Sequence, residues 1–453
     1  MNELEQLFEM NFISDIYETK IRNKSGRGID RMSVIDFDRK KEVHFSTIAR
    51  KCCSGTYKFS LYLQRLILKG PHSKPRSISI PTVRYKIVLK ILNIILQNYF
   101  PDCVKRELPN VKVRNLASQI SSHDNALYLH RLDIKSYYDN INIEKLCSIL
   151  TGSNIPPAIL ALIRGAITTQ SVQSGHHKSD LHNIIPTNGV PQGLPISNML
   201  AEIYLRNIDT ELKAKFEYYD RYVDDIVILS KTKDNIDKYC EAVFSDIDLE
   251  LNTEKTKYFC QDSPVQFLGY TLLQNEITVK ATTLEKHLRS ISMMFARLKK
   301  TLSLEKKRKR KIGVGIIKSA FVEDLNVKIA GAKYQNKRYG WLQYFSEITD
   351  TQIPYLIDNF VRTQFQKSPV FSTIPPDLKH ASRAFYELKF SGKSTTYLHN
   401  YEEVDTQKKR DWLTKRGLAP GTFTGPNIDQ LYAYHVGRFL SQIERDMGLD
   451  YKI

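Results

Sequence analysis

The chain has 453 residues, enough for a sizeable core and, at about 100 to 200 residues per domain, for roughly two to four domains. Its formal charge of +18, from 67 Lys and Arg against 49 Asp and Glu, favours a polyanionic partner and above all nucleic acid. No apolar run approaches about 18 residues, so no membrane span is predicted. The start Met1–Glu5 is acidic, unlike a signal peptide, and the six cysteines show neither zinc nor disulfide spacing, so we expect a cytoplasmic protein.

The first part of the chain mixes helix-like stretches with the basic segment Lys69–Arg76. The alternating residues Ser77–Ile80 predict a strand that Pro81 ends, because proline cannot donate a hydrogen bond to a β-ladder. Residues 126–270 then alternate short strand-like and helix-like segments, which indicates an α/β centre.

Two strands and a helix are predicted within this centre. The apolar run that starts at Leu127 leads into Asp133, and Ile226–Leu229 is a β-branched run suited to a buried strand. Between them, apolar residues recur at helical spacing over Met199–Leu212, and Ser197 is expected to cap the start of that helix. After about residue 275 the pattern is expected to be helical or irregular, and it is strongly basic.

Acidic residues at the ends of the predicted strands are the feature with the clearest chemistry. Asp224 and Asp225 lie between two apolar segments that can pair as a β-hairpin, although aspartate is also a common turn former in purely structural hairpins. Asp133 ends the upstream run, so three carboxylates can converge. Two Mg²⁺ ions about 4 Å apart need shared oxygen ligands and promote phosphoryl transfer, with Asp133 and Asp224 as the natural bridging ligands.

Five segments, in this order along the chain, resemble the motifs of bacterial reverse transcriptases related to group II intron and retron enzymes. They are Asp133–Ile141 (motif A), Gly189–Ser197 (motif B), Tyr222–Asp225 (the catalytic motif C), Leu249–Lys257 (motif D) and Phe267–Tyr270 (the primer-grip motif E). Upstream, Arg76–Val83 is similar to the fingers motif, but Ser77, Ser79 and Tyr85 stand where the family usually has Pro, Gly and Asp.

The resemblance implies an α+β, right-hand polymerase fold whose palm contains an antiparallel sheet. It places fingers at residues 1–125 with further fingers elements at about 142–188, a palm at 126–270, a helical thumb at 271–370 and a helical C-terminal extension at 371–453.

The resemblance also implies the catalytic residues. Asp133, Asp224 and Asp225 would catalyse the reaction and, with Ile134, would hold two Mg²⁺ ions, for which Mn²⁺ is a substitute; Tyr222 flanks them. Lys255 matches a motif D lysine that would protonate the departing pyrophosphate, and nearby Lys257 is easily confused with it.

Four residues would bind the nucleotide. Tyr138 matches the steric gate against a 2′-OH, with a core aromatic as the alternative, and Gln192 lies in a Gly-rich turn that is otherwise an ordinary loop. Lys74 and Arg76 would neutralise the triphosphate, or would lie in a solvated loop.

Other residues are assigned to nucleic acid. Phe267, Leu268, Gly269 and Tyr270 would form the primer grip. One basic run would contact phosphates or would form a solvated helix face: Lys306, Lys307, Arg308, Lys309, Arg310 and Lys311. A second group would contact phosphates and stack on bases, or would belong to a packed aromatic core: Lys337, Arg338 and Trp341. His176 and His177 fit a solvated loop better than a metal site.

The type of reverse transcriptase is suggested by signatures that the sequence lacks. It has no Cys/His-rich endonuclease segment, no obvious RNase H-like acidic quartet and no Val-Thr-Gly thumb signature of retrons. A polymerase core with its own helical extension most resembles the defence-associated bacterial enzymes of the DRT and unknown groups.

By this analogy we expect an RNA-directed DNA polymerase that acts in antiviral (anti-phage) defence. Its partners would be an RNA template, as a dedicated non-coding RNA, together with dNTPs, the DNA product and either a second copy of the chain or a partner enzyme. The alternatives are a template-independent or protein-primed DNA polymerase on the same site, or a non-catalytic RNA-binding scaffold, which clustered carboxylates argue against.

Overall fold

The protein has an α+β fold that divides into two compact units. The computed structural model describes residues 3–22, 26–68, 74–104, 107–122, 128–176, 186–232, 235–254, 256–260, 263–273, 276–305, 313–391, 395–418 and 427–446. Unit 1 comprises Met1–Glu107 and Asn125–Gln261, and unit 2 comprises Leu108–Asp124 and Asp262–Ile453. Among the described residues, no helix combines the length and apolar character needed to cross a bilayer.

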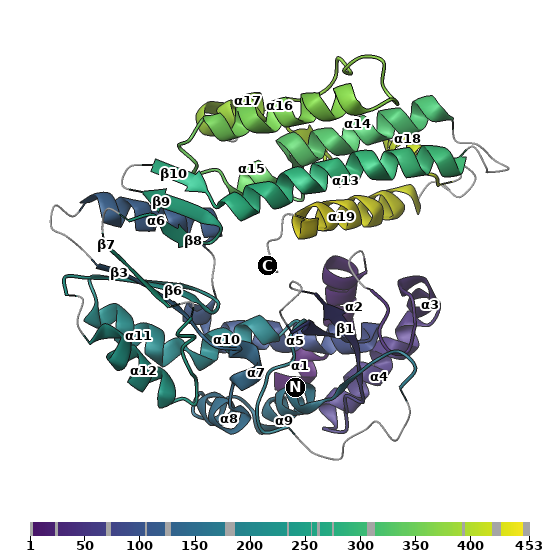
Figure 1. Ribbon diagram of the computed structural model, residues 1–453. Helices are drawn as coiled ribbons and strands as arrows, with labels where there is room; N and C mark the ends of the chain where they lie inside the picture. The colour runs from purple at the N-terminus through teal and green to yellow at the C-terminus, as the bar shows by residue number, and fades with distance from the viewer. Residues whose placement is uncertain are drawn as a thin grey trace. The chain divides into compact units, whose positions relative to one another are not determined.

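Unit 1 contains helices around two small sheets (Figure 1). Its helices are α1 (Glu3–Leu7), α2 (Met10–Ile16), α3 (Val34–Asp38), α4 (Lys41–Cys53), α5 (Val83–Tyr99), α7 (Tyr137–Asn140), α8 (Ile143–Thr151), α9 (Pro157–Thr168), α10 (Ser197–Tyr204), α11 (Arg206–Lys215) and α12 (Ile236–Ser245), with a π-helical turn at Tyr17–Ile21 and a 3₁₀ turn at Pro101–Cys103. Its strands are β1 (Tyr62–Ile67), β2 (Arg76–Ile80), β3 (Tyr128–Asp133), β4 (Ser171–Val172), β5 (Tyr218–Tyr222), β6 (Asp225–Ser230) and β7 (Lys257–Cys260).

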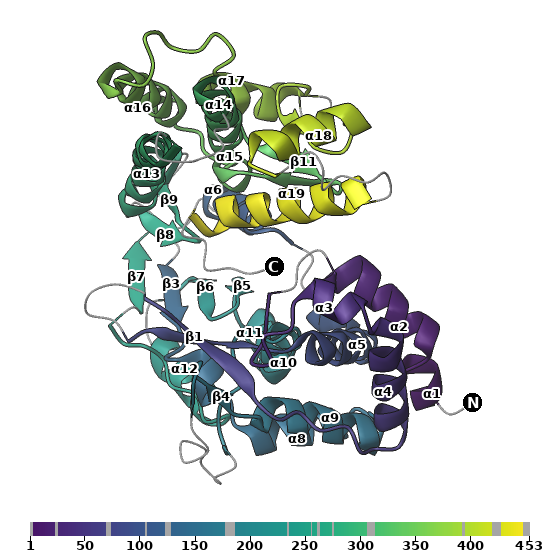
Figure 2. The ribbon, with the colours of Figure 1, turned by 90° about the vertical axis from the view of Figure 1, so that its right-hand side faces the viewer.

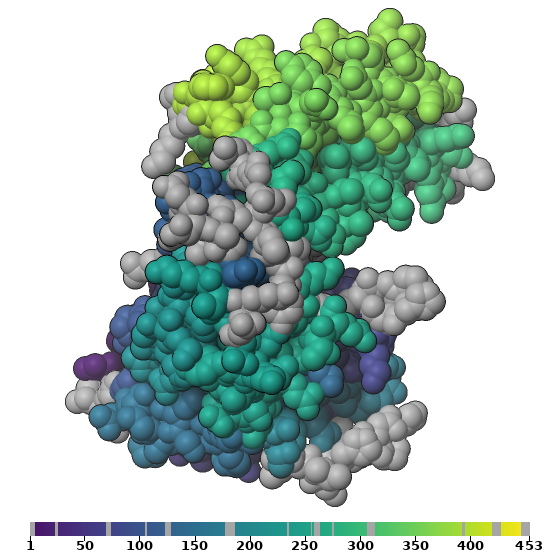
Figure 3. Space-filling model, turned by 60° about the vertical axis from the view of Figure 1, so that its left-hand side comes forward, coloured from purple at the N-terminus to yellow at the C-terminus, as the bar shows by residue number. Residues whose placement is uncertain are grey.

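The central sheet of unit 1 is antiparallel, with the strand order β5-β6-β3-β7. Helices α10, α11 and α12 lie on one face of this sheet, and the outer sides of α11 and α12 form part of the teal surface in Figure 3. Leu132 and Ile226 are buried on the helix-covered face, in the same core as Leu212 and Phe244. Because side chains alternate along a strand, Asp133 and Asp225 belong to the opposite face.

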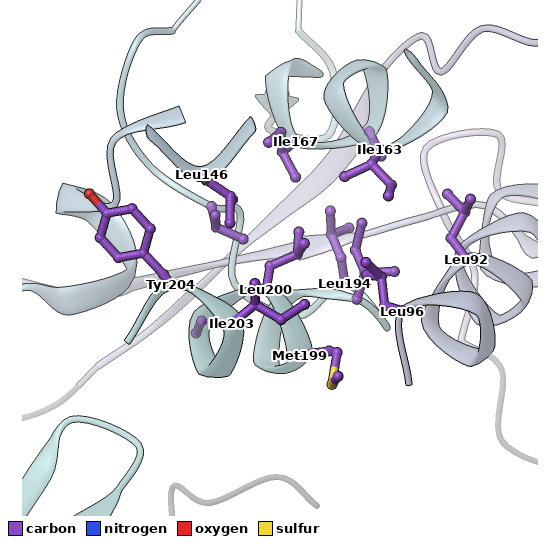
Figure 4. Close-up of a cluster of buried hydrophobic side chains, with 14 of the residues drawn as sticks. Leu92, Leu96, Leu146, Ile163, Ile167, Leu194, Met199, Leu200, Ile203 and Tyr204 are labelled. Atoms are coloured by element: carbon purple, nitrogen blue, oxygen red, sulfur yellow. The ribbon is translucent and has the colours of Figure 1, made fainter. Parts of the chain in front are cut away.

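The same core also supports the Gly-rich turn that precedes α10. Helices α5, α8, α9 and α10 contribute apolar side chains to it, and Figure 4 shows Leu194 of the turn among them. The residues labelled there are Leu92, Leu96, Leu146, Ile163, Ile167, Leu194, Met199, Leu200, Ile203 and Tyr204. The smaller sheet of this unit has the order β2-β1-β4, with β1 antiparallel to β2 and parallel to β4.

Unit 2 is mainly helical and also contains two three-stranded sheets, β10-β9-β8 and β12-β11-β13. Its helices are α6 (Pro109–Ser122), α13 (Ala281–Glu305), α14 (Val314–Ala330), α15 (Trp341–Tyr344), α16 (Gln352–Lys367), α17 (Ala381–Tyr386), α18 (Thr406–Lys415) and α19 (Asn427–Asp446), with a π-helical turn at Glu387–Ser391. Its strands are β8 (Val265–Phe267), β9 (Tyr270–Leu273), β10 (Glu276–Val279), β11 (Ala332–Tyr334), β12 (Lys337–Tyr339) and β13 (His399–Asn400).

The last part of unit 2 has its own apolar core. Helices α18 and α19 pack against each other (Figure 2), and Trp412, Tyr432 and Val436 are buried between them and β11. The expectation of helical or irregular structure after about residue 275 was therefore incomplete, because the short strands β10 to β13 leave little period-2 signal in a sequence.

The predicted strands of unit 1 are confirmed. Strand β2 ends at Ile80, before Pro81, and β3 ends at Asp133. The helix predicted over Met199–Leu212 is wrong in one respect, because Leu205 interrupts it and separates α10 from α11. Ser197 is also not the N-cap: Ile196 holds that position, and the Ser197 hydroxyl donates instead to the Pro191 carbonyl at 2.5 Å.

The assignment of fingers, palm, thumb and extension stays a prediction. The compact units divide the chain differently, because α6, inside the expected fingers, and the β8–β9 hairpin, at the end of the expected palm, both belong to unit 2.

Candidate active site

An acidic hairpin, residues 218–230, forms the centre of the candidate site. β5 ends at Tyr222 and β6 begins at Asp225, and these two residues are cross-strand partners, so Val223 and Asp224 form the turn. Val223 has a φ of +61°, a left-handed conformation that β-branched residues rarely adopt. Such a backbone persists only where its surroundings hold it. The predicted hairpin is therefore present, with the two acidic residues at its turn.

The buried guanidinium of Arg221 binds this turn from the helix-covered face of the sheet. Its Nη1 donates to the Val223 carbonyl at 2.9 Å, its Nε to Asp209 Oδ1 at 2.7 Å and its Nη2 to Glu202 Oε2 at 2.7 Å. Burial by itself would lower the pKa of Arg221, but the carboxylates of Glu202 and Asp209 keep that pKa well above the ordinary arginine value. The Tyr219 hydroxyl also donates to Asp209, at 2.6 Å. Strand β5 is thus fixed to α10 and α11 by one charged network.

Strand register brings the third acidic residue to the hairpin. Asp133, at the end of β3, is the direct cross-strand partner of Asp225, at the start of β6. The backbone N–H of Ile134 donates to the Asp224 carbonyl at 3.3 Å, which continues the contact into the turn. Asp133 and Asp225 are only 9% and 7% exposed. The three predicted catalytic aspartates therefore meet at one end of the sheet.

Two polar side chains contact these carboxylates. Arg131 donates from Nε and Nη2 to Asp225 Oδ1, at 3.1 and 2.6 Å. Asn252 donates from Nδ2 to Asp133 Oδ2 at 3.2 Å and from its backbone N–H to the Asp133 carbonyl at 2.7 Å. Asn252 lies in the segment that resembles motif D, so this contact attaches that segment to the end of β3.

The carboxylate oxygens of the three aspartates suit a hard divalent cation, but the described side chains do not form a complete metal site. Carboxylate oxygens are preferred ligands of Mg²⁺, and two nearly buried carboxylates in direct register are costly unless positive charge neutralises them. Within the described ranges, no three carboxylate, imidazole or thiolate side chains form a group able to hold a metal. Strand register thus brings the three residues together, Arg131 holds the Asp225 carboxylate, and a shared metal site stays a prediction.

The Gly-rich turn, residues 189–196, connects the predicted nucleotide-binding residues. The Val190 N–H donates to the Tyr138 carbonyl at 2.8 Å, and the Ser79 N–H donates to the Gln192 carbonyl at 2.7 Å. The Gln192 side-chain amide reaches Asp139 Oδ1 at 3.4 Å. The turn is thereby attached to both α7 and β2. A Cβ on Gly193, whose φ is +99°, would lie 2.7 Å from the Ile78 side chain and 3.0 Å from the Ser79 carbonyl, so the close approach to β2 requires glycine.

Tyr138 lies within electrostatic reach of the acidic hairpin. Its ring is partly buried, packs near Tyr137 with ring centroids 5.5 Å apart, and its hydroxyl donates to Asn198 Oδ1 at 3.1 Å. Burial first, and then the charges of Glu202 and Asp224, raise the pKa of Tyr138, while Arg76 acts in the opposite direction. The structure therefore brings Tyr138, Arg76 and Asp224 into one neighbourhood.

The remaining residues predicted near the nucleotide differ in exposure. Lys74 is exposed two positions before the partly buried Arg76 at the start of β2. Tyr222, beside the turn, is partly buried, and burial together with Glu202 raises its pKa to about 12.

The predicted primer-grip residues form the turn between β8 and β9 in unit 2. Phe267, Leu268 and Tyr270 are fully buried, and the Tyr270 ring lies 4.8 Å from that of Phe345. Gly269 has a φ of +84°, and a Cβ there would lie 3.3 Å from Phe345. The turn is thus part of the core of unit 2, and its role toward a primer stays a prediction.

The other residues assigned to nucleic acid differ in burial, and some lie outside the described residues. Trp341 is 1% exposed and stacks on His287 with ring centroids 4.6 Å apart, which fits the packed-core alternative and leaves no face for a base. Lys337 is exposed and Arg338 is partly buried, both on β12. The remaining cations fall outside the described residues: Lys255, Lys306, Lys307, Arg308, Lys309, Arg310 and Lys311.

Several polar residues of the site were not predicted from the sequence. They are Arg131, Glu202, Asp209, Arg221 and Asn252. One signal was available for Arg221: it alternates with Tyr219 on the face of β5 that pairs with the apolar Ile226 and Ile228. A charge on such a face requires a buried partner.

The aspartates lie within a segment that matches a known protein family. Residues 67–272 match the family model described as Reverse transcriptase (RNA-dependent DNA polymerase). The chain is 25% identical over 163 residues to the "Uncharacterized 91 kDa protein in cob intron" of Schizosaccharomyces pombe, which covers 34% of this chain and 20% of that protein. The chain therefore spans about a fifth of the length of this curated relative.

Solved structures with similarity to the chain include two telomerases. Telomerase from Candida albicans, in complex with a TWJ fragment of telomeric RNA, is 13% identical with a TM-score of 0.42, covering 92% of this chain and 67% of that chain. Apo telomerase from Candida tropicalis is 13% identical with a TM-score of 0.43, covering 86% of this chain and 64% of that chain.

The chain therefore contains a segment, residues 67–272, that matches a reverse transcriptase domain. The expected fold class, an α+β right-hand polymerase, is confirmed by this match together with the antiparallel four-stranded sheet that holds the aspartates.

Replacing Arg221 tests whether the buried network holds the acidic hairpin. We expect Arg221→Gln to lower the free energy of unfolding by about 3–5 kcal/mol, because Glu202 and Asp209 lose the cation that compensates their buried charges. Urea unfolding measures this loss. As a control, Arg206→Gln removes the exposed ion pair between Arg206 and Asp102 and should cost less than about 1 kcal/mol. Equal costs for the two variants would show that the Arg221 network does not support the fold.

Replacing Gly193 tests the close approach of the Gly-rich turn to β2. Gly193→Ala and Gly175→Ala introduce similar backbone strain, since φ is +99° and +87°, but a Cβ on Gly175 meets nothing within 4 Å. We expect Gly193→Ala to destabilise the protein by about 1–3 kcal/mol more than Gly175→Ala in thermal unfolding. Matching melting temperatures for the two variants would contradict a tight contact at Gly193.

Proposed function

We propose that this chain adds dNTPs by two-metal phosphoryl transfer and copies a partner non-coding RNA into DNA in antiviral (anti-phage) defence. The observation that carries the proposal is the direct register of Asp133 with Asp225, with Asp224 in the adjacent turn and Tyr138 and the Gly-rich turn beside them. This arrangement combines candidate metal ligands with a candidate nucleotide site.

Each residue of the site has a role in this reaction. Asp133, Asp224 and Asp225 would hold two Mg²⁺ ions, which when bound activate the attacking hydroxyl and stabilise the leaving pyrophosphate. Arg76 and Lys74 would neutralise the triphosphate, since charge neutralisation dominates phosphoryl transfer. The ring of Tyr138 would fill the space that a 2′-OH needs, and Gln192 would line the nucleotide site. Lys255 would donate the proton to the departing pyrophosphate.

The proposed partner is a dedicated non-coding RNA in the cytoplasm. The formal charge of +18 supports binding of a polyanion, and the exposed Lys337 on β12 adds a cation to the surface of unit 2. The role in defence is an analogy, based on a polymerase domain accompanied by a largely helical C-terminal part. A second copy of the chain, or a partner enzyme, would complete the assembly.

Two other functions make different products. A template-independent or protein-primed DNA polymerase would use the same aspartates but make DNA unrelated to the bound RNA. A non-catalytic RNA-binding scaffold would need none of the aspartates, and two nearly buried carboxylates in register argue against it, because their charges are costly without a metal ion.

The first experiment identifies the product. We expect the protein, purified with its accompanying RNA and given Mg²⁺ and dNTPs, to make DNA complementary to that RNA, whereas Asp224→Ala/Asp225→Ala should make none. Sequencing of the product, beside a reaction with rNTPs, gives the result. Repetitive DNA unrelated to the RNA would favour untemplated synthesis, and a double variant with unchanged biological activity would favour the scaffold.

A second experiment tests Tyr138 as the steric gate. We expect Tyr138→Ala to raise incorporation of rNTPs relative to dNTPs by about tenfold, or about 1.4 kcal/mol, because the space beside the nucleotide sugar opens. Single-nucleotide extension assays measure this ratio. Tyr138→Phe retains the ring and should keep the wild-type preference, although it loses the hydrogen bond to Asn198. Unchanged selectivity in Tyr138→Ala would favour the core-aromatic alternative.

A further inference from the structure

We propose that Arg131 is an internal counter-ion of the active site, which holds Asp225 while no metal is bound and competes with a divalent cation for that carboxylate. The inference rests on the proposed function only in taking Asp225 as a metal ligand. It adds a positioning residue to the site, because Arg131 acts through Asp225.

The sheet places Arg131 on the same face as the catalytic aspartates. Arg131 precedes Asp133 by two residues on β3, so their side chains leave the strand on one side. Its partner on β6 is Val227, two residues after Asp225, which makes Arg131 a diagonal neighbour of Asp225. A long side chain spans this diagonal, and the guanidinium reaches Asp225.

The contact occupies a specific carboxylate oxygen. Both the Nε and the Nη2 of Arg131 donate to Asp225 Oδ1, at 3.1 and 2.6 Å. The Arg131 side chain is 23% exposed and that of Asp225 is 11% exposed, so the pair is largely removed from water. Charge-assisted hydrogen bonds of this kind are among the stronger ones in proteins. The guanidinium therefore competes with a cation for the same oxygen.

Charge balance explains why the site needs this arginine. Asp133, Asp224 and Asp225 lie together at the end of the sheet, and the first and third are direct cross-strand partners. Like charges in this position repel each other. The guanidinium of Arg131, on the same strand as Asp133, lowers that repulsion until metal ions replace it. The same pair then raises the metal concentration that the enzyme requires, because the apparent dissociation constant grows as the metal-competent fraction of the protein falls.

Lys135 provides a matched comparison on the other side of Asp133. It also lies two residues from Asp133 and carries one positive charge, but its ammonium pairs with Glu250 at 2.9 Å and both side chains are exposed. Replacing Lys135 thus changes the net charge equally without freeing a catalytic carboxylate. Replacing Arg131 by lysine keeps the charge but removes the planar set of donors that binds the carboxylate.

The test measures metal binding directly, without DNA synthesis. Full-length protein is freed of RNA with nuclease and titrated with Mn²⁺, and unbound Mn²⁺ is followed by its electron paramagnetic resonance signal. Asp225→Asn identifies the binding that depends on Asp225. We expect Arg131→Gln to lower the Mn²⁺ dissociation constant of that site by about fivefold to tenfold, Arg131→Lys to lower it less, and Lys135→Gln to leave it within about twofold of wild type.

A second readout uses the protein without metal. In EDTA, Arg131→Gln should melt below wild type, because the aspartates lose their counter-ion, and Mn²⁺ should raise its melting temperature by more than that of wild type. If Arg131→Gln does not fold, Arg131→Lys supplies both measurements.

Several results would overturn the inference. Unchanged or weaker Mn²⁺ binding in Arg131→Gln would do so, as would equal gains in Arg131→Gln and Lys135→Gln, or Mn²⁺ binding that does not depend on Asp225. Failure of the proposed function has a different signature: Mn²⁺ binding that follows the expected order in a protein that makes no DNA on any RNA.

Discussion

The buried ion network of Arg221 is the interaction on which the candidate active site depends. A single guanidinium joins the carbonyl of the hairpin turn to carboxylates from two successive helices, Glu202 of α10 and Asp209 of α11. Because the guanidinium donates in several fixed directions, it sets the position of β5 relative to both helices. The left-handed backbone of Val223 and the outward placement of Asp224 and Asp225 follow from that anchoring.

Two arginines balance the acidic charge on opposite faces of the same sheet. Arg221 neutralises carboxylates on the face covered by helices, and its own side chain is fully buried there. Arg131 lies on the other face and is partly exposed, as the proposed exchange of its Asp225 contact for a metal ion requires. The alternation of side chains along a β-strand separates these tasks. One arginine supports the fold, while the other pairs with a proposed metal ligand.

Much of this site could be predicted from the sequence, and the parts that could not depend on contacts between distant residues. Strands β3 and β6 were predictable because they are largely apolar and adjoin acidic residues, with Asp133 at the end of β3 and Asp225 at the start of β6. The break at Leu205 and the use of the Ser197 hydroxyl by Pro191 were not, because local spacing does not show which tertiary partner a side chain finds. The segment around Trp341 has the mixture of cations and aromatic residues that is typical of base stacking. Only the burial of Trp341 against His287 shows that this residue belongs to the core.

The Gly-rich turn links the apolar core to the place where a nucleotide would bind. Leu194 points into the core formed by α5, α8, α9 and α10, while Gly193 approaches β2 and the Val190 N–H bonds to the Tyr138 carbonyl (Figure 4). A bulky residue at the turn would push β2 away, and a polar residue at Leu194 would lose the packing that fixes the turn. Packing of buried leucines and isoleucines thus determines the distance between Arg76 on β2 and Tyr138 on α7. Nucleotide selectivity at the proposed site would therefore depend on residues that the nucleotide does not touch.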